Sequence, residues 1–213
     1  MKRLSAILFL SIMFSVCVAV PSSMALGLGL YWTSAWGEAA YNAEDDNDNT
    51  WDWDSNIERR GYGFVLDTAV AKDSLVNLRL NIGYYNFQEE DQDDNIFDLD
   101  GFQGVADLGF GIVRNQYLRL WVGGELSAAY GEGSIEDFDD FEVKMISVGV
   151  GPVVGVNFHL SDRISFGLKG GYLYEGFIGE GENTITDVKV DYDGFTYQYF
   201  VVLSAFYRFN DVF

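Results

Sequence analysis

After residue 26 the chain alternates apolar residues with glycine or polar residues at every second position. A period of two places neighbouring side chains on opposite faces of a β-strand, whereas a helix would repeat its apolar positions every three or four residues. The alternation is seen at residues 27–32, 61–70, 76–84, 102–112, 118–128, 146–159, 164–174 and 197–209. The chain is therefore predicted to fold as eight β-strands.

The segments between these strands alternate between short and long. The short connections lie at 71–74, 114–117 and 160–163, and the long ones at 37–58, 88–100, 131–142 and 175–193. Short turns at one end and long loops at the other are typical of an up-and-down antiparallel barrel. We therefore predict that residues 26–213 form one domain, an all-β, eight-stranded antiparallel transmembrane β-barrel. Because proline cannot donate to a strand ladder, Pro152 predicts a bulge at Gly151 and Pro152.

The two faces of the predicted strands indicate the surroundings of the barrel. One face is a continuous series of large apolar residues with aromatic residues towards its ends, and the other combines glycine with charged residues. Eight strands close into a barrel that side chains can fill. An apolar outer band with aromatic girdles is typical of transmembrane barrels. A secreted soluble β-protein is the alternative, but it would expose a continuous apolar face to water.

The composition excludes several classes of protein. The net charge of −20, from 33 acidic and 13 basic residues, argues against nucleic-acid binding because phosphates would be repelled. An aromatic content of 16% excludes a disordered chain, and a single cysteine excludes a disulfide scaffold. Most acidic residues fall in the four long connections, so we expect the charge to form acidic extracellular loops.

The first 25 residues have the pattern of a secretory signal peptide. Lys2 and Arg3 form a positive start, residues 6–20 form an apolar core, and Ser23-Met24-Ala25 matches a small-x-small cleavage site. A membrane anchor is the alternative, but the apolar core is shorter than the roughly 20 residues that a spanning helix needs. We predict that residues 1–25 are a signal peptide that is removed.

The last predicted strand ends in Tyr207-Arg208-Phe209, and the chain ends in Phe213. This strand resembles the closing strand of small outer-membrane barrels of the OmpX, OmpA and OmpW families, which often end in Tyr-Arg-Phe. The resemblance implies insertion by the barrel assembly machinery, with Tyr207, Phe209 and Phe213 as the assembly signal. It also implies a multi-pass protein of the Gram-negative outer membrane with both termini periplasmic. Ser204 departs from the pattern, because glycine is common there.

Charged residues on the glycine-bearing face are candidates for a network inside the barrel. Because an unpaired buried charge is costly, we expect these residues to pair with one another. The pairs would form either a static plug or a gate that re-pairs to admit water and ions. Arg79 and Asp107 are a candidate pair within this set. The candidate lumen network comprises Asp67, Arg79, Asp107, Arg119, Glu125 and Lys169.

Two acidic runs in the long connections are candidate sites for Ca²⁺ or Mg²⁺, which prefer oxygen ligands. Bound ions would rigidify the loops or bridge them to the phosphates of lipopolysaccharide. Neither run has the spacing of an EF-hand loop, and a solvated acidic surface is the alternative. No other cofactor is expected. The candidate ligands are Asp45, Asp46, Asp48, Asp91, Asp93 and Asp94.

We expect a small porin-like or structural outer-membrane protein, with at most a narrow pore for small solutes. The alternative is a surface interaction or adhesion module whose acidic loops bind divalent cations, lipopolysaccharide or other ligands. Enzymatic activity is not expected. His159 is the only histidine and lies beside a short turn, whereas some lipid-editing barrels use a histidine near the outer leaflet. A Ser-His-Asp triad cannot be built from it there.

Overall fold

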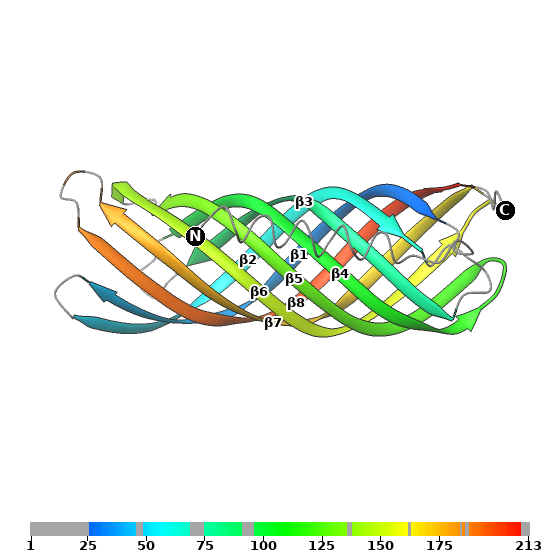
Figure 1. The fold of residues 1–213 in the computed structure, drawn as a ribbon, viewed down its shortest axis with the longest axis horizontal. Helices are drawn as coiled ribbons and strands as arrows, with labels where there is room; N and C mark the ends of the chain where they lie inside the picture. Colours follow the sequence, from blue (N-terminus) through cyan, green and yellow to red (C-terminus); the bar gives the residue numbers. More distant parts are fainter. Residues whose placement is uncertain are drawn as a thin grey trace, which may run out of the picture.

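In the computed structural model the chain forms a closed barrel of eight antiparallel strands in sequence order (Figure 1). The strands are β1 (Gly27–Asp45), β2 (Thr50–Asp67), β3 (Val76–Glu90), β4 (Ile96–Arg114), β5 (Leu118–Ile135), β6 (Phe138–His159), β7 (Ile164–Asn183) and β8 (Lys189–Arg208). The structure describes residues 26–45, 49–68, 75–90, 96–135, 138–161, 163–183, 185 and 188–209. The predicted eight-stranded antiparallel barrel is confirmed. The predicted signal peptide, residues 1–25, lies outside the described residues.

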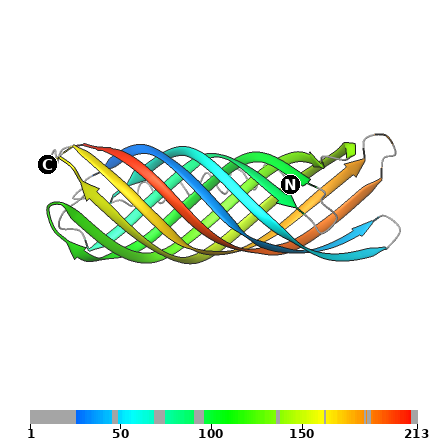
Figure 2. The same ribbon diagram turned by 180° about the vertical axis from the view of Figure 1, so that it is seen from behind.

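The first and last strands close the ring. β1 pairs with β8 from Gly27 opposite Arg208 to Asp45 opposite Val190. Figure 2 shows the two strands side by side, blue beside red. A closed ring has no edge strand, so the backbone N–H and C=O groups find their partners within the sheet. We call the end of the barrel at which β1 begins and β8 ends the turn end, and the opposite end the acidic end.

Within the described ranges, no helix is long and apolar enough to cross a membrane.

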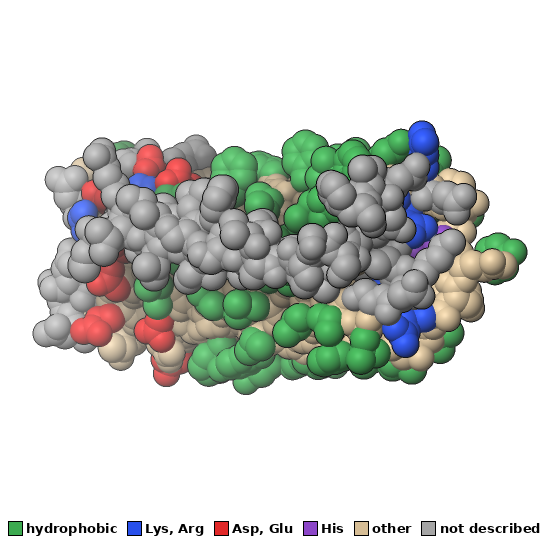
Figure 3. Space-filling view, turned by 45° about the vertical axis from the view of Figure 1, so that its right-hand side comes forward, with side chains coloured by type: hydrophobic (Ala, Val, Ile, Leu, Met, Phe, Trp, Pro, Cys, Tyr) green, Lys and Arg blue, Asp and Glu red, His purple; other side chains and the backbone are tan. Residues whose placement is uncertain are grey.

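The sequence alternation separates an outer surface from a lumen. On β2, Phe64 is 66% exposed whereas its neighbour Val65 is 1% exposed. The outward side chains form an apolar belt around the barrel, green in Figure 3. Aromatic side chains stand at its border towards the acidic end, among them Trp36, Tyr62 and Phe102. An aromatic border of this kind is typical of a membrane–water interface.

The connections predicted to be long loops are mostly strand. β1 and β2 stay paired as far as Glu44 opposite Thr50, within the loop predicted at 37–58. The other three long connections are shortened in the same way. The prediction was wrong because charged positions were interpreted as loop although the alternation continues through them. Ala39 and Tyr41 point into the lumen while Glu38 faces outward.

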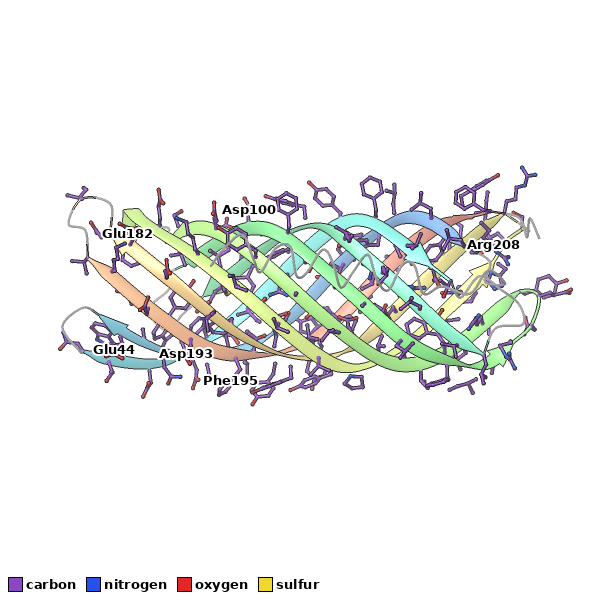
Figure 4. All side chains as sticks on the ribbon, in the orientation of Figure 1. Glu44, Asp100, Glu182, Asp193, Phe195 and Arg208 are labelled. Carbon is purple, nitrogen blue, oxygen red and sulfur yellow. The ribbon has the colours of Figure 1, made fainter. Side chains whose placement is uncertain are left out.

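The strand segments beyond the apolar belt form a wall that we call the collar. It comprises residues 37–45, 50–60, 86–90, 96–101, 131–135, 138–145, 176–183 and 189–194. In Figure 4, Glu44 and Glu182 lie in the collar, at the opposite end of the barrel from Arg208. Most of the acidic residues that the sequence assigned to loops and that the structure describes are therefore held on paired strands.

The ladder between β6 and β7 is interrupted at Pro152 without a bulge. The pairs Val150–Tyr174 and Val153–Gly171 keep one register, and Gly151 and Pro152 have no ladder partner on β7. On the other side, Pro152 stays in register opposite Gly124 of β5. The predicted bulge is therefore wrong. No residue is inserted, and the missing N–H of proline removes ladder bonds without shifting the strand.

Glycine on the inner wall makes room for large rings that cross the lumen. Trp121 of β5 is fully buried, and a Cβ atom added at Gly155 of β6 would overlap its indole ring. Gly124 is the contrasting case. A Cβ atom there would face outward, and its nearest contact would be the Gly151 carbonyl oxygen at 3.9 Å.

Replacement of Gly155 by alanine is expected to destabilise the barrel by about 1–3 kcal/mol, because the new methyl group forces the indole ring out of its position. Urea unfolding in lipid vesicles, followed by tryptophan fluorescence, measures the change. Gly124→Ala is the matched control on the neighbouring strand and should unfold like the original protein. Equal stability of Gly155→Ala and Gly124→Ala would contradict this packing.

Candidate functional site: a charged lumen beneath an acidic collar

All six residues of the predicted lumen network are buried inside the barrel. Their exposed fractions are 5% or less. They come from β2 to β5 and from β7, so the network bridges much of the ring. Among the described residues, buried arginine and lysine side chains are equal in number to buried carboxylates. They are Arg59, Arg79, Arg119, Lys169 and Arg208, and Asp67, Glu89, Asp107, Glu125 and Glu175.

Arg79 pairs with Asp67 near the turn end. Its Nη2 atom lies 2.6 Å from Asp67 Oδ2, and its Nε atom donates to the same oxygen at 3.0 Å. Nη2 also donates to Asn157 Oδ1 across the lumen at 2.9 Å. The guanidinium carbon lies 5.3 Å from the ring centre of Trp121 and 5.1 Å from that of Phe206. Arg79 is thus held by one carboxylate, one amide and two aromatic faces.

Lys169 joins two carboxylates in the middle of the barrel. Its Nζ atom donates to both oxygens of Asp107 at 2.9 Å and to Glu125 Oε2 at 2.5 Å. The candidate pair of Arg79 and Asp107 is therefore wrong, although the two residues are register partners on β3 and β4. Arg79 instead pairs with Asp67 on its other neighbouring strand, β2, and Asp107 pairs across the lumen with Lys169 of β7.

A further ion pair, between Arg59 and Glu175, was missed by the sequence analysis. Arg59 Nη2 lies 2.6 Å from Glu175 Oε1, and both side chains are buried. Ser127 donates to the other carboxylate oxygen at 3.2 Å. The guanidinium lies over the rings of Tyr85 and Phe87. The signal was the two-residue period, which places Arg59 on the same face of β2 as Val65 and Asp67.

Three more basic side chains lie near the turn end. Arg119, a member of the predicted network, donates from Nη2 to the Val76 carbonyl at 3.4 Å. His159 and Ser165 form a buried pair, with Nδ1 and Oγ 2.9 Å apart. Arg208, from the closing strand, also points inward. Basic residues therefore gather at the lumen's turn end.

An apolar layer crosses the lumen at the acidic end. We call it the mouth cluster. Its buried members are Ala39, Tyr41, Ile57, Tyr85, Phe87, Leu99, Ala129, Val143, Met145 and Phe177, with Trp53, Phe141 and Tyr192 packed against them. Every strand of the barrel contributes at least one of these side chains. Tyr41 stacks on Trp53 with ring centres 4.8 Å apart and donates a hydrogen bond to Glu89.

A second apolar layer lies nearer the turn end. This central cluster comprises Tyr31, Ala35, Val65, Trp121, Val153, Leu173, Phe200, Val202 and Phe206. Between the ion pair of Arg59 and the carboxylates around Lys169 lies a cavity of about 30 Å³, lined by both polar and apolar side chains. Gln103, Asn81 and Gln198 are among its lining residues. The described part of the lumen therefore combines apolar clusters and ion pairs with a small cavity between them.

The outward face of the collar carries most of the exposed charge. Its exposed acidic residues are Glu38, Glu44, Asp52, Asp54, Asp98, Asp100, Glu132, Glu142, Glu180, Asp191 and Asp193. Basic side chains there are paired, as Arg60 is with Glu58 at 2.7 Å and Lys189 with Glu182 at 3.5 Å. Figure 4 shows Asp193 in the collar and Phe195, two residues further along β8, closer to the middle of the barrel.

The predicted metal ligands cannot be placed. Asp46, Asp48, Asp91, Asp93 and Asp94 lie outside the described residues, and the side chain of Asp45 is also outside them. Within the part of the chain that the structure describes, no group of three or more His, Cys, Asp or Glu side chains is arranged to hold a metal ion. A metal site at the strand tips stays a prediction.

The predicted assembly residues lie on the outer surface of the closing strand where they are described. Tyr207 is 47% exposed and Phe209 is 49% exposed, and their rings pack edge to face. Phe213 lies outside the described residues.

Comparison with solved structures identifies the fold. The outer membrane protein OprG from Pseudomonas aeruginosa aligns over 88% of this chain and 96% of its own, with a TM-score of 0.68 and 10% sequence identity. The chain has the fold of an outer-membrane β-barrel. Neither a protein-family model nor a curated protein sequence matches it.

Two further structures align along most of the chain at lower TM-scores. Ail, the attachment invasion locus protein of Yersinia pestis, covers 84% of this chain and 98% of its own, with a TM-score of 0.36 and 14% identity. The outer membrane protease OmpT from Escherichia coli covers 87% and 97%, with a TM-score of 0.39 and 9% identity.

The neighbouring residues Arg59 and Arg60 allow a direct test of the buried ion pairs. Arg59→Met leaves Glu175 buried without its partner and is expected to cost about 3–5 kcal/mol of unfolding free energy. Arg60→Met breaks an exposed pair and should cost less than about 1 kcal/mol.

The double variant Arg59→Met/Glu175→Leu should recover much of the stability, because no uncompensated charge is left in the lumen. Urea unfolding in lipid vesicles measures all three variants. Equal losses for Arg59→Met and Arg60→Met would show that the lumen pair is not buried as described.

Proposed function

We propose that the protein is a closed, non-conducting barrel of the bacterial outer membrane that holds the acidic collar at the cell surface. The mouth cluster carries this proposal, because every strand places an apolar side chain in the same layer of the lumen. Conduction needs a continuous path for water and ions. The cavity beneath has a volume of about 30 Å³. That is room for roughly two water molecules.

The proposed orientation places the turn end in the periplasm and the collar outside the cell. Both described ends of the barrel, Gly27 and Arg208, lie at the turn end. In outer-membrane barrels the short turns face the periplasm, which supports this orientation. The chain would then cross the membrane eight times with both termini periplasmic.

The packed lumen favours a structural or surface-interaction role over a narrow pore. A collar of paired strands holds its carboxylates at fixed spacing, which suits contacts with divalent cations or with the cation-bridged phosphates of lipopolysaccharide. Aromatic residues at the border of the belt support contact with membrane lipid. The outward Tyr207 and Phe209 are available to the barrel assembly machinery during insertion.

We also propose that the protein is not an enzyme. His159 and Ser165 form the one histidine–serine pair among the described residues, and both are buried at the turn end. A triad needs an accessible serine and an oriented carboxylate. The burial of this pair supports a structural role for it.

Planar-bilayer recordings test the closed lumen. The protein should produce no stable conductance steps, because the two apolar layers interrupt the water path. A variant with Phe87→Ala, Phe177→Ala and Trp121→Ala removes large rings from both layers and should produce steps. Those steps should favour cations, because the collar is acidic.

Heat-modifiable gel mobility provides the folding control for each preparation. A folded, unmodified barrel that gives stable cation-selective steps would contradict the closed lumen and favour the porin-like function. Gel mobility that does not change on boiling would contradict the barrel itself.

A further inference from the structure

The exposed charges of the described residues are separated along the barrel axis. Every exposed carboxylate lies in the collar, at the acidic end. At the turn end the exposed charged residues that the structure describes are Arg114 and Arg163. Figure 3 shows red side chains with a few blue ones at one end of the apolar belt, and blue side chains without red ones at the other. Among the described residues, carboxylates are therefore exposed beyond one border of the belt and arginines beyond the other.

Arg163 is held at the turn-end border by a tightly bonded turn between β6 and β7. The Leu160 N–H donates to the Ile164 carbonyl at 3.0 Å. Ser161 Oγ accepts hydrogen bonds from the N–H groups of Arg163 and Ile164, at 3.3 and 3.1 Å. The Arg208 N–H donates to the Arg163 carbonyl at 2.7 Å. The backbone of Arg163 is thus fixed from within the turn and from β8.

The side chain of Arg163 lies beside aromatic residues of the closing strand. Its Nη1 atom donates to the Tyr207 hydroxyl at 3.3 Å. The ring of Phe209 packs edge to face against Tyr207 at 5.6 Å between centres. The apolar belt begins at the next residue, Ile164, which is the register partner of Tyr207. Both of these side chains are 47% exposed.

This arrangement has the chemistry of a lipid headgroup site. A guanidinium group has five N–H donors in a planar fork that matches the oxygens of a phosphate, and the Tyr207 contact uses one of them. Aromatic rings at the border of an apolar belt lie at the depth of the headgroups. A basic side chain at that depth is attracted to anionic lipid.

We propose that Arg163, Tyr207 and Phe209 form a binding site for the phosphate headgroup of an anionic phospholipid, on the outer wall of the turn end. The guanidinium binds the phosphate oxygens, and the acyl chains lie along the apolar face of β7 and β8. The site rests on the proposed insertion of the barrel in a membrane, and the proposed orientation places it in the periplasmic leaflet. A lipid is the occupant because the charged group adjoins side chains that face the bilayer.

Native mass spectrometry of the full barrel in detergent micelles tests the site. The protein is mixed with phosphatidylglycerol or, separately, with zwitterionic phosphatidylcholine, and the bound lipid is counted. The unmodified protein should retain more phosphatidylglycerol than phosphatidylcholine. Arg163→Gln should reduce phosphatidylglycerol binding about fivefold, the loss expected for one arginine at an anionic surface. The turn should stay intact, because its hydrogen bonds use the backbone of Arg163.

Arg60→Gln is the matched control, because Arg60 is an exposed arginine in the collar and pairs with Glu58. It should bind phosphatidylglycerol like the unmodified protein. Equal binding of the two lipids, or an equal loss in Arg60→Gln and Arg163→Gln, would overturn the site. Heat-modifiable gel mobility separates this failure from failure of the barrel, because a folded barrel without lipid preference refutes the headgroup site alone.

Discussion

Closure of the hydrogen-bonded ring is the constraint on which the rest of the structure depends. β1 pairs with β8 along its whole length, so the sheet has no edge. In hydrocarbon each unpaired backbone group costs several kcal/mol, and a closed barrel is one of two ways to avoid that cost. Once the ring is closed, each residue faces either the lumen or the outside. The separation of apolar, charged and acidic surfaces follows from that single division.

The sequence predicts the faces of the strands better than their lengths. Alternation locates the eight strands and predicts that Asp67, Arg79 and Lys169 point inward, because successive side chains of a strand point to opposite faces of the sheet. It fails beyond the apolar belt, where outward positions such as Asp191 and Asp193 are charged and were interpreted as loop. Their inward neighbours Tyr192 and Gly194 keep the period, so the signal was present on one face only.

The partners of the buried charges could not be predicted from the alternation. The period shows that a side chain points inward, but it does not show how far a long side chain reaches. Arg79 and Asp107 are neighbours in register, yet Arg79 bonds to Asp67 and Asp107 bonds to Lys169. The choice of ion-pair partner depends on the space that glycines and large rings leave inside the lumen. Those positions are set by all eight strands together and not by any local pattern.

The strand pairing of the collar has a consequence for proteolysis. A protease binds its substrate as an extended, unpaired segment, and much of the collar backbone is paired with both neighbouring strands, whereas residues 50–55 of β2 pair with β1 only. Segments such as Ala39–Tyr41, with neighbours on β2 and β8, would have to leave the sheet before they could be cleaved. These doubly paired segments carry acidic side chains on a backbone that offers proteases little to bind. We expect this protection to come from hydrogen bonding in the wall and not from the choice of side chains on it.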